Sequence, residues 1–263
     1  MKLRGYLTVG VAGVLLVVLD LAQRTVVTLL VKVMPRRRER ILGRWQRWIA
    51  HMVLGLVRVV GGARVGSLPR VPGRPGVLLV MNHQSLLDIP LMVASLDDLY
   101  PRIVTRSRYG RGKPLISHMI RLYQYPQVTP RATGKGHLRE IEEAATTSTV
   151  PFAIFPEGTR TRDGRIGRFR RGGIGRILES RQWTVYLLVV DGFWQSARLD
   201  DFLAGVSSID GEIRRLGPLE SPPPGEPVEP FIREIRARMV AELADMRGEG
   251  AGAVDEAAGD EAT

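Results

Sequence analysis

The chain has 263 residues, of which 44% are hydrophobic and 25% charged, a composition that supports a buried core and excludes a wholly disordered protein. Its net charge of +11 indicates anionic partners such as phosphorylated substrates, acidic lipid headgroups or nucleic acid. It contains no cysteine, which excludes disulfides, cysteine nucleophiles and thiolate metal sites, and its four histidines leave little room for a histidine-rich metal site.

An apolar segment covers residues 1–34. Residues 6–19 carry no charge, and Asp20, Gln23 and Arg24 then interrupt the apolar character. A helix that crosses a bilayer needs about 20 predominantly apolar residues, so the first run alone is short for a span. We expect a retained membrane-anchoring segment, either a single span or an interfacial anchor. A signal peptide and a buried helix of a soluble domain are the alternatives.

Residues 35–62 are predicted to form a basic amphipathic helix. Arginines cluster between Arg36 and Arg47, and apolar residues then recur at steps of three and four, which places them on one face of a helix. With Trp45 and Trp48, the arginines fit a helix lying at the headgroup level of a bilayer, and the alternative is a core helix of the soluble domain. The basic cluster also predicts that the rest of the chain lies on the cytoplasmic face.

Residues 63–220 alternate short apolar runs with stretches of helical character. Buried strands are predicted over residues 77–81, 103–105, 150–155 and 185–190. Helices are predicted over residues 86–96, 114–123, 136–147 and 172–179. Strands alternating with helices indicate an α/β fold with a mixed, largely parallel sheet flanked by helices.

Two further segments follow this α/β region. Residues 221–247 begin with a Pro-rich, extended linker and continue into an amphipathic helix. Residues 248–263 are small and acidic, and we expect this tail to be disordered.

A polar cluster from Asn82 to Asp88 directly follows the first predicted strand. His83 is suited to general-base chemistry near neutral pH, and Asp88 is suited to holding its imidazole in one tautomer. Five residues rotate about 140° on a helix, so the pair requires His83 on the turn and Asp88 inside the next helix, with Ser85 as its N-cap. The alternative is a histidine with a structural hydrogen bond.

A second polar cluster, from Phe155 to Arg160, ends the third predicted strand. Pro156 breaks the strand and Gly158 permits a positive φ. The N–H groups of such a turn, together with the guanidinium fork of Arg160, suit a phosphate dianion. The alternative is an ordinary turn with a solvated arginine.

Basic residues are dense around both clusters. Residues 101–139 contain nine Lys or Arg and no acid, and residues 160–176 contain seven Arg against one Asp. A nucleic-acid groove is also basic, but here the aromatic residues form no stacking pattern and no recognition-helix motif is present. We therefore expect no nucleic-acid partner.

The two polar clusters resemble the motifs of the PlsC-type lysophospholipid acyltransferases, the 1-acyl-glycerol-3-phosphate acyltransferase family. Residues 82–88 match Asn-His-x-Ser-x-x-Asp in full, and residues 155–160 match Phe-Pro-Glu-Gly-Thr-Arg, with Thr161 in place of the family's following Ser. The stretch that corresponds to Gly-x-x-Phe-Ile-x-Arg keeps only Arg131, and residues 187–190 lack the family's Val-Pro. Both departures concern the acyl acceptor more than the reaction.

The resemblance implies transfer of a fatty acyl chain from acyl-CoA or acyl carrier protein to the free hydroxyl of 1-acyl-glycerol-3-phosphate, giving phosphatidic acid in phospholipid biosynthesis. It implies that His83 and Asp88 are catalytic and that no metal or cofactor is needed beyond the acyl donor as co-substrate. The residues it assigns to acceptor binding are Arg131, Glu157, Gly158, Thr159 and Arg160. From the residues alone, Glu157 either bonds to a hydroxyl or orients Arg160.

Alternatives from three classes stay open. The same chemistry could act on glycerol-3-phosphate, another lysophospholipid or an amino-acid lysolipid. The chain could instead be a non-catalytic basic protein that binds membranes or nucleic acid, or a serine hydrolase built on Ser85. The expected partners are membrane lipids, an anionic bilayer surface and the acyl donor, and the oligomeric state is left open.

Overall fold

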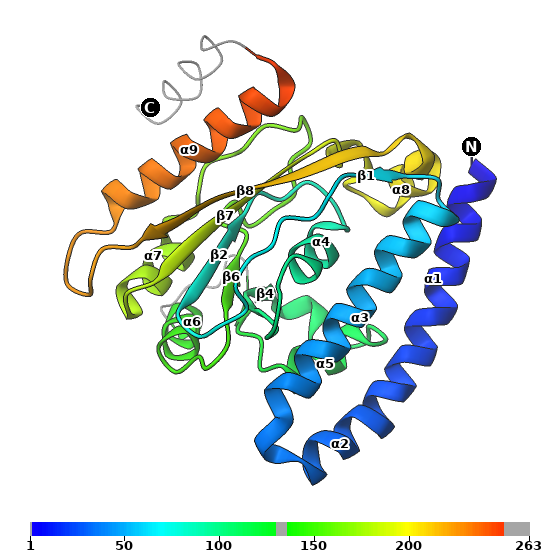
Figure 1. The fold of residues 1–263 in the computed structure, drawn as a ribbon, viewed down its shortest axis with the longest axis horizontal. Helices are drawn as coiled ribbons and strands as arrows, with labels where there is room; N and C mark the ends of the chain where they lie inside the picture. Colours follow the sequence, from blue (N-terminus) through cyan, green and yellow to red (C-terminus); the bar gives the residue numbers. More distant parts are fainter. Residues whose placement is uncertain (1, 130–135, 250–263) are drawn as a thin grey trace.

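A computed structural model describes residues 2–129 and 136–249 (Figure 1). Its centre is a six-stranded sheet in the order β1-β8-β7-β2-β6-β3. The strands are β1 (Arg64–Val65), β8 (Asp210–Glu220), β7 (Thr184–Asp191), β2 (Val77–Met81), β6 (Phe152–Ile154) and β3 (Arg102–Ile103). Strands β7, β2, β6 and β3 are parallel, whereas β8 runs antiparallel to β7. The sheet is therefore mixed and largely parallel, as predicted.

Helices cover both faces of this sheet because its central strands are apolar on both sides. In β2 all five residues are buried; Leu78 and Val80 face one core cluster, while Leu79 and Met81 face the other. The first cluster lies under α6 (Gly136–Thr146), α7 (Arg171–Ser180) and α9 (Glu229–Arg247). The second lies under α3 (Arg38–Val59), α4 (Asp88–Ala94) and α5 (Ile116–Leu122). The result is a three-layer α/β architecture.

The predicted elements match the observed ones best where an apolar run is continuous. Strand β2 has the predicted bounds, and β7 and α6 differ from prediction by a residue at their ends. The run predicted over residues 103–105 is divided between β3 and β4 (Thr105–Arg106), which pairs with β5 (Gln127–Val128) in a separate two-stranded sheet.

Four strands and helices were absent from the prediction. They are β1, β5, the eleven-residue strand β8 and the short helix α8 (Leu199–Gly205). Strand β8 is only half-buried and carries Glu212, Arg214 and Arg215, so it lacks the continuous apolar run of its neighbours. Its strand conformation comes from pairing with β7, which is a tertiary contact.

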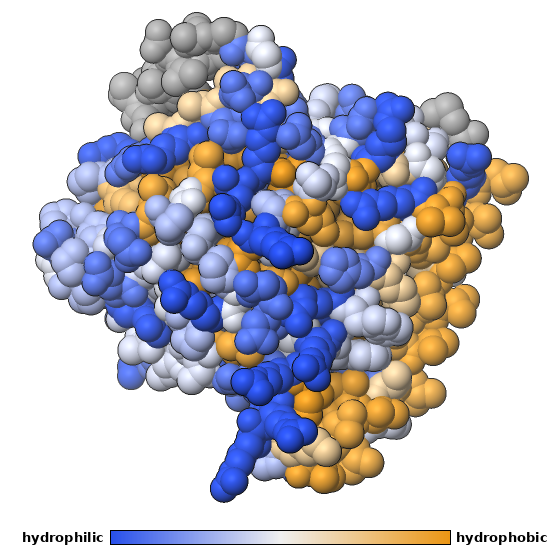
Figure 2. Space-filling model, viewed as in Figure 1, coloured by the Kyte–Doolittle hydropathy of each residue, from blue (hydrophilic) through white to orange (hydrophobic). Residues whose placement is uncertain are grey.

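The N-terminal segment forms a helical hairpin with α3 (Figure 1). Its first arm is a continuous helix made of α1 (Lys2–Ala22), a π-helical turn at Gln23–Val27 and α2 (Thr28–Val33). Among the described residues, Leu3–Val33 is one helix with the length and apolarity needed to cross a membrane, and 17% of its most apolar window is buried. Figure 2 shows apolar side chains along the edge that α1 and α2 form. A helix this exposed is not a core helix of a soluble domain.

Helix α3 has a different environment. Leu42, Leu54 and Val57 on its apolar face are buried in the main core, where α3 packs against α4. Trp48 remains half-exposed and stacks on Trp45. Much of the predicted apolar stripe therefore faces protein, as a core helix requires. A turn over Pro35–Arg37 joins the two arms and carries the first two arginines of the basic cluster, and the others lie on α3.

Candidate active site

The site lies at the carboxyl ends of three neighbouring parallel strands. Strand β2 leads into His83, β6 leads into the turn that contains Glu157, and β7 ends at Asp191. Open α/β sheets present their ligands at this edge. The two polar clusters identified in the sequence are thus brought together by the order β7-β2-β6.

His83 and Asp88 form a hydrogen-bonded pair. The Nδ1 atom of His83 lies 2.6 Å from Oδ2 of Asp88, whose side chain is fully buried. The same Oδ2 accepts the main-chain N–H groups of Gln84 at 2.7 Å and Ser85 at 2.8 Å. Because this carboxylate is surrounded by donors, we assign the ring proton to Nδ1, which leaves Nε2 as the basic nitrogen. The prediction placed His83 on the turn and Asp88 inside the following helix, and in the structure Asp88 is the first residue of that helix.

Ser85 has a different role from the predicted one. The helix begins at Asp88 with Leu87 as its N-cap residue, so Ser85 lies too early in the chain to be the N-cap. Its hydroxyl accepts the N–H of Leu87 and donates to Oδ1 of Asp88 at 3.1 Å. Ser85 therefore stabilises the tight turn and the carboxylate, and its hydroxyl is engaged inside the protein rather than presented as a nucleophile.

Asn82 and Phe155 complete the surroundings of the histidine. Asn82 is buried and exchanges two hydrogen bonds with the main chain of Val190, which ties the end of β2 to β7. The Phe155 ring stacks on the His83 imidazole, with ring centroids 4.4 Å apart. Both residues thus restrict where the imidazole can lie.

Glu157 binds main chain on two sides. Oε1 accepts the N–H of His83 and Oε2 accepts the N–H of Gly167, both at 2.9 Å. Burial raises the pKa of this carboxyl, and the two N–H bonds oppose the increase. Neither oxygen contacts Arg160, whose guanidinium donates to the carbonyl of Ala197. Of the two roles considered from the residues alone, orientation of Arg160 is therefore not observed.

The turn after Glu157 is closely packed with arginines. Gly158 adopts φ +66°, and an added Cβ would lie 2.9 Å from Cδ of Arg170. Arg106 donates to the carbonyl of Gly158. Nε of Arg160 is buried without a hydrogen-bond partner among the described residues. The neighbouring guanidinium groups of Arg106, Arg160 and Arg170 concentrate positive charge at this turn, which suits an incoming anion.

Sequence reasoning missed Arg106 and Arg170 as site residues. Burial lowers the pKa of the Arg106 guanidinium, and the neighbouring cations Arg108, Arg170 and Arg160 lower it further. The available signal was the density of basic residues over 101–139 and 160–176. That density does not distinguish an arginine at the site from one in solvent.

The remaining predicted binding residues differ in their placement. Thr159 is exposed on the turn. The N–H of Gly158 donates to Phe155 within the turn, so it is not free for the phosphate contact predicted for it. Arg131 lies outside the described residues. No cluster of three or more metal-ligating side chains occurs within the described part of the chain.

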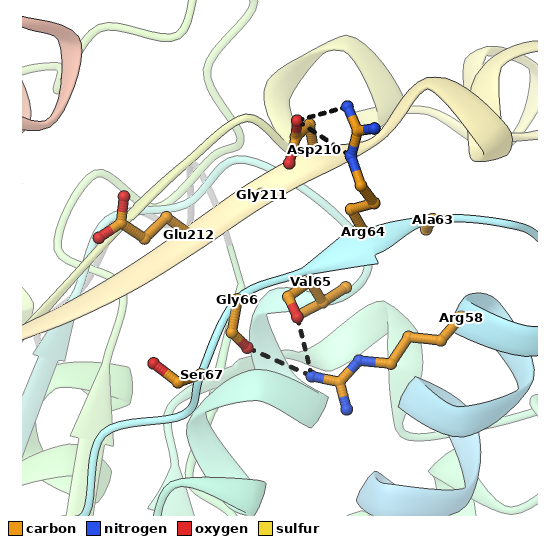
Figure 3. Close-up of a pocket in the computed structure, with 9 residues that line it drawn as sticks. All are labelled: Arg58, Ala63, Arg64, Val65, Gly66, Ser67, Asp210, Gly211 and Glu212. Carbon is orange, nitrogen blue, oxygen red and sulfur yellow. Dashed lines mark hydrogen bonds and ion pairs between the residues drawn. The ribbon is translucent and has the colours of Figure 1, made fainter.

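A large hollow lies elsewhere, between β1, the start of β8 and the end of α3 (Figure 3). It measures about 740 Å³ and contains none of the predicted site residues. Two of its arginines are already paired: Arg64 with Asp210, and Arg58 with the carbonyls of Val65 and Gly66. Both guanidinium groups already donate to protein acceptors, so the hollow is a weaker candidate site than the one around His83.

Two comparisons with known proteins relate this chain to acyltransferases. Residues 63–190, which are just under half of the chain, match the model of the Acyltransferase family. A similar solved structure is the 1-acyl-sn-glycerophosphate (LPA) acyltransferase PlsC from Thermotoga maritima, with a TM-score of 0.63 and 19% sequence identity. The similarity covers 92% of this chain and 99% of that one. No curated protein matches this chain.

Proposed function

We propose that this acyltransferase moves a fatty acyl chain from acyl-CoA or acyl carrier protein to the free hydroxyl of 1-acyl-glycerol-3-phosphate, giving phosphatidic acid. The observation that carries the proposal is the His83–Asp88 pair beside the arginine-rich turn at Gly158–Arg160. The pair supplies a base for a hydroxyl, and the turn supplies cations for a phosphate on the same molecule.

The proposed reaction uses His83 as a general base. Nε2 accepts the proton of the acceptor hydroxyl as its oxygen attacks the thioester carbonyl carbon. The C–S bond then breaks, and the imidazolium returns the proton to the leaving thiolate, so the products are an ester and a thiol. Asp88 stabilises the imidazolium in the interval. General-base assistance of this kind contributes about 10²–10⁴-fold in rate.

The acceptor phosphate is assigned to the arginines of the turn. Arg160 carries a buried donor without a partner among the described residues, and Arg106 and Arg170 pack against Gly158. A planar guanidinium binds phosphate through two parallel hydrogen bonds, which fixes the orientation of the acceptor as well as its affinity. Orientation matters here because the hydroxyl must reach Nε2 of His83.

The proposal includes a membrane location for the hairpin. The Leu3–Val33 helix is about 46 Å long at about 1.5 Å per residue, compared with about 30 Å for a hydrocarbon core. At one end Gly5 packs so tightly on α8 that an added Cβ would lie 1.7 Å from the carbonyl oxygen of Leu203. At the other end Val31 is buried in the main core. Because both ends of the helix are held on the domain, these contacts support an interfacial anchor rather than a single membrane span.

This location suits the substrates. Exposing the acyl chain of a lysolipid to water costs about 0.8 kcal/mol per CH₂, and an enzyme on the bilayer surface avoids full extraction. The basic turn between the hairpin arms supports contact with an anionic leaflet and a cytoplasmic orientation of the catalytic domain.

The decisive experiment uses the full chain in liposomes with acyl-CoA or acyl carrier protein donors and a panel of lysolipids and glycerol-3-phosphate. Products are identified by mass spectrometry, with His83→Ala beside the wild type. Phosphatidic acid formed by the wild type and lost by about 10²–10⁴-fold in the variant is the expected result. Transfer to a different acceptor alone would replace the proposed substrate, and transfer to none would contradict the proposed activity.

A further inference from the structure

Helix α9 lies outside the residues that match the family model, yet its last residue reaches the site. Its apolar face, which includes Phe231, Ile235, Met239 and Leu243, packs in the core cluster on the sheet face shared with β7 (Figure 1). This packing sets the position of Arg247, where α9 ends.

Arg247 and Asp191 form a bidentate ion pair at the end of β7. Nε of Arg247 lies 2.8 Å from Oδ2 of Asp191, and Nη2 lies 2.7 Å from Oδ1. The two side chains are 19% and 20% exposed. A guanidinium fork that binds both carboxylate oxygens restrains orientation as well as distance. The pair therefore fixes the Asp191 carboxylate relative to α9.

Asp191 in turn contacts the residue that follows His83. Its Oδ1 accepts from Nε2 of Gln84 at 3.2 Å, and Oε1 of Gln84 accepts the N–H of Phe193 at 3.1 Å. Gln84 is fully buried, and its own N–H donates to Asp88. Three hydrogen-bonded steps thus connect Arg247 to the carboxylate that orients the catalytic imidazole.

The same helix also binds the loop that follows Arg160. Arg247 donates to the carbonyl of Gly164 at 2.9 Å, and Arg236 donates to those of Ile166 and Gly167 at 3.3 and 3.1 Å. Gly164 has φ +81°, and an added Cβ would lie 2.7 Å from Nη2 of Arg247. The carbonyl side of the loop is therefore anchored to α9.

The amide side of this loop is anchored to the catalytic machinery. The N–H of Thr161 donates to the carbonyl of His83 at 2.8 Å, and the N–H of Gly167 donates to Glu157, which also binds the N–H of His83. The loop thus lies between α9 and the main chain of His83. A displacement of one side is transmitted to the other through direct hydrogen bonds.

We propose that Arg247, acting through Asp191, is a positioning residue of the acyl-transfer site. Arg247 holds Gln84 and the 161–167 loop so that Arg160 meets the acceptor phosphate. The inference rests on the proposed function for its kinetic consequence, but its structural consequence is independent of activity. It makes α9 part of the active-site scaffold rather than a peripheral cover of the sheet.

Arg247→Gln, Arg247→Lys, Asp191→Asn and the double variant Arg247→Gln/Asp191→Asn are compared with the wild type. The matched control is Arg238→Gln, also on α9, whose guanidinium binds Glu234 in an exposed i,i+4 pair. Thermal unfolding measures the folded fraction of each variant. The double variant removes both charges of the pair, so no charge is left unpaired. It therefore separates loss of positioning from loss of stability.

The kinetic readout is KM for 1-acyl-glycerol-3-phosphate in liposomes. In Arg247→Gln we expect KM to increase about tenfold with kcat changed less than about twofold, since direct hydrogen-bonded networks couple residues at this level. Arg247→Lys should recover part of the loss, because an ammonium keeps the charge but cannot bind both oxygens in a fork. The double variant should unfold near the wild-type temperature and keep the elevated KM. An unchanged KM, with activity reduced only in proportion to the folded fraction, overturns the proposal.

Hydrogen–deuterium exchange provides a readout that needs no activity. The N–H groups of Thr161 and Gly167 should exchange about tenfold faster in Arg247→Gln than in Arg238→Gln. Equal exchange in both variants overturns the proposal whatever the kinetics. If the wild type transfers no acyl chain, the proposed function fails, and the exchange result alone decides whether Arg247 positions the loop.

Discussion

Oε1 of Glu157 accepts the main-chain N–H of His83 at 2.9 Å, although 74 residues separate the two in the chain. The same carboxylate binds Gly167, so one side chain joins the two motifs and the basic loop. The motif glutamate therefore binds the backbone of His83. Two consequences follow: the His83 turn cannot shift independently of the Gly158–Arg160 turn, and the charge state of Glu157 matters to both.

Glu157→Gln should weaken this connection. The amide keeps one acceptor oxygen and turns its NH₂ group toward one of the two N–H donors, leaving buried groups unsatisfied at a cost of about 1–3 kcal/mol each. Denaturant unfolding measures the loss, and Glu179→Gln, an exposed residue on α7, is the control. A Gln variant as stable as the wild type would contradict the double N–H contact.

The same variant tests a pH dependence. Because burial raises the folded-state pKa of Glu157 above its ordinary 4.5, the folded state binds more protons than the unfolded state between the two values. The free energy of unfolding of the wild type, relative to Glu157→Gln, should therefore decrease as pH rises from 4.5 through the raised pKa and level off above it. A difference that increases with pH over this window would have the wrong sign.

Arg106→Gln should affect acceptors with a phosphate most. We expect KM for 1-acyl-glycerol-3-phosphate to increase about tenfold, since a charged hydrogen bond contributes about 1.5–3 kcal/mol. Transfer to a monoacylglycerol, which lacks the phosphate, should change less than about twofold. Arg139→Gln, whose guanidinium binds Glu143 in solvent, is the control. Equal losses on both acceptors would assign Arg106 to the fold instead of the phosphate.

The hairpin can be tested with single exposed positions. Val14→Lys and Leu29→Lys change residues that are 67% and 61% exposed, so folding should be little affected. Each should weaken binding to anionic vesicles by at least about 1.5 kcal/mol, the contribution of one buried aliphatic side chain. Thr146→Lys on α6 is the control for added charge. Flotation measures binding, and vesicle affinity that stays unchanged would argue against the anchor. Deleting residues 1–62 is a poorer test, because α3 belongs to the core.

Gln23 connects this hairpin to the catalytic domain. It is fully buried in the π-helical turn; its Nε2 lies 2.9 Å from Nδ1 of His118, and its Oε1 accepts from Nε1 of Trp45 at 3.0 Å. Gln23→Leu should lower the free energy of unfolding by about 1–3 kcal/mol, because both partners lose a hydrogen bond. Thr25→Val in the same turn is exposed and should change it by less than about 0.5 kcal/mol. Thermal unfolding in detergent compares the two, and equal effects would refute the role given to Gln23.

Much of the site was predictable because its determinants are local. The apolar run at Val77–Met81 specifies a buried strand, and the polar residues that follow specify where it ends. The spacing from His83 to Asp88 requires a turn followed by a helix, and the structure has both. The role of Ser85 was predicted less well, because a serine that caps a helix and a serine that stabilises the turn before it have the same local sequence pattern.

What the sequence alone determined is the α/β alternation, the apolar hairpin arm and the two polar clusters that contain the His83–Asp88 pair and the Gly158–Arg160 turn. Each depends on neighbouring residues and on the burial of continuous apolar runs. Tertiary structure decided the strand conformation of β8, the contact of Glu157 with His83, the approach of Arg106 to Gly158 and the ion pair between Arg247 and Asp191. These depend on which strands become neighbours in the sheet, and a hydrogen bond between residues far apart in the chain leaves no periodic pattern in the sequence.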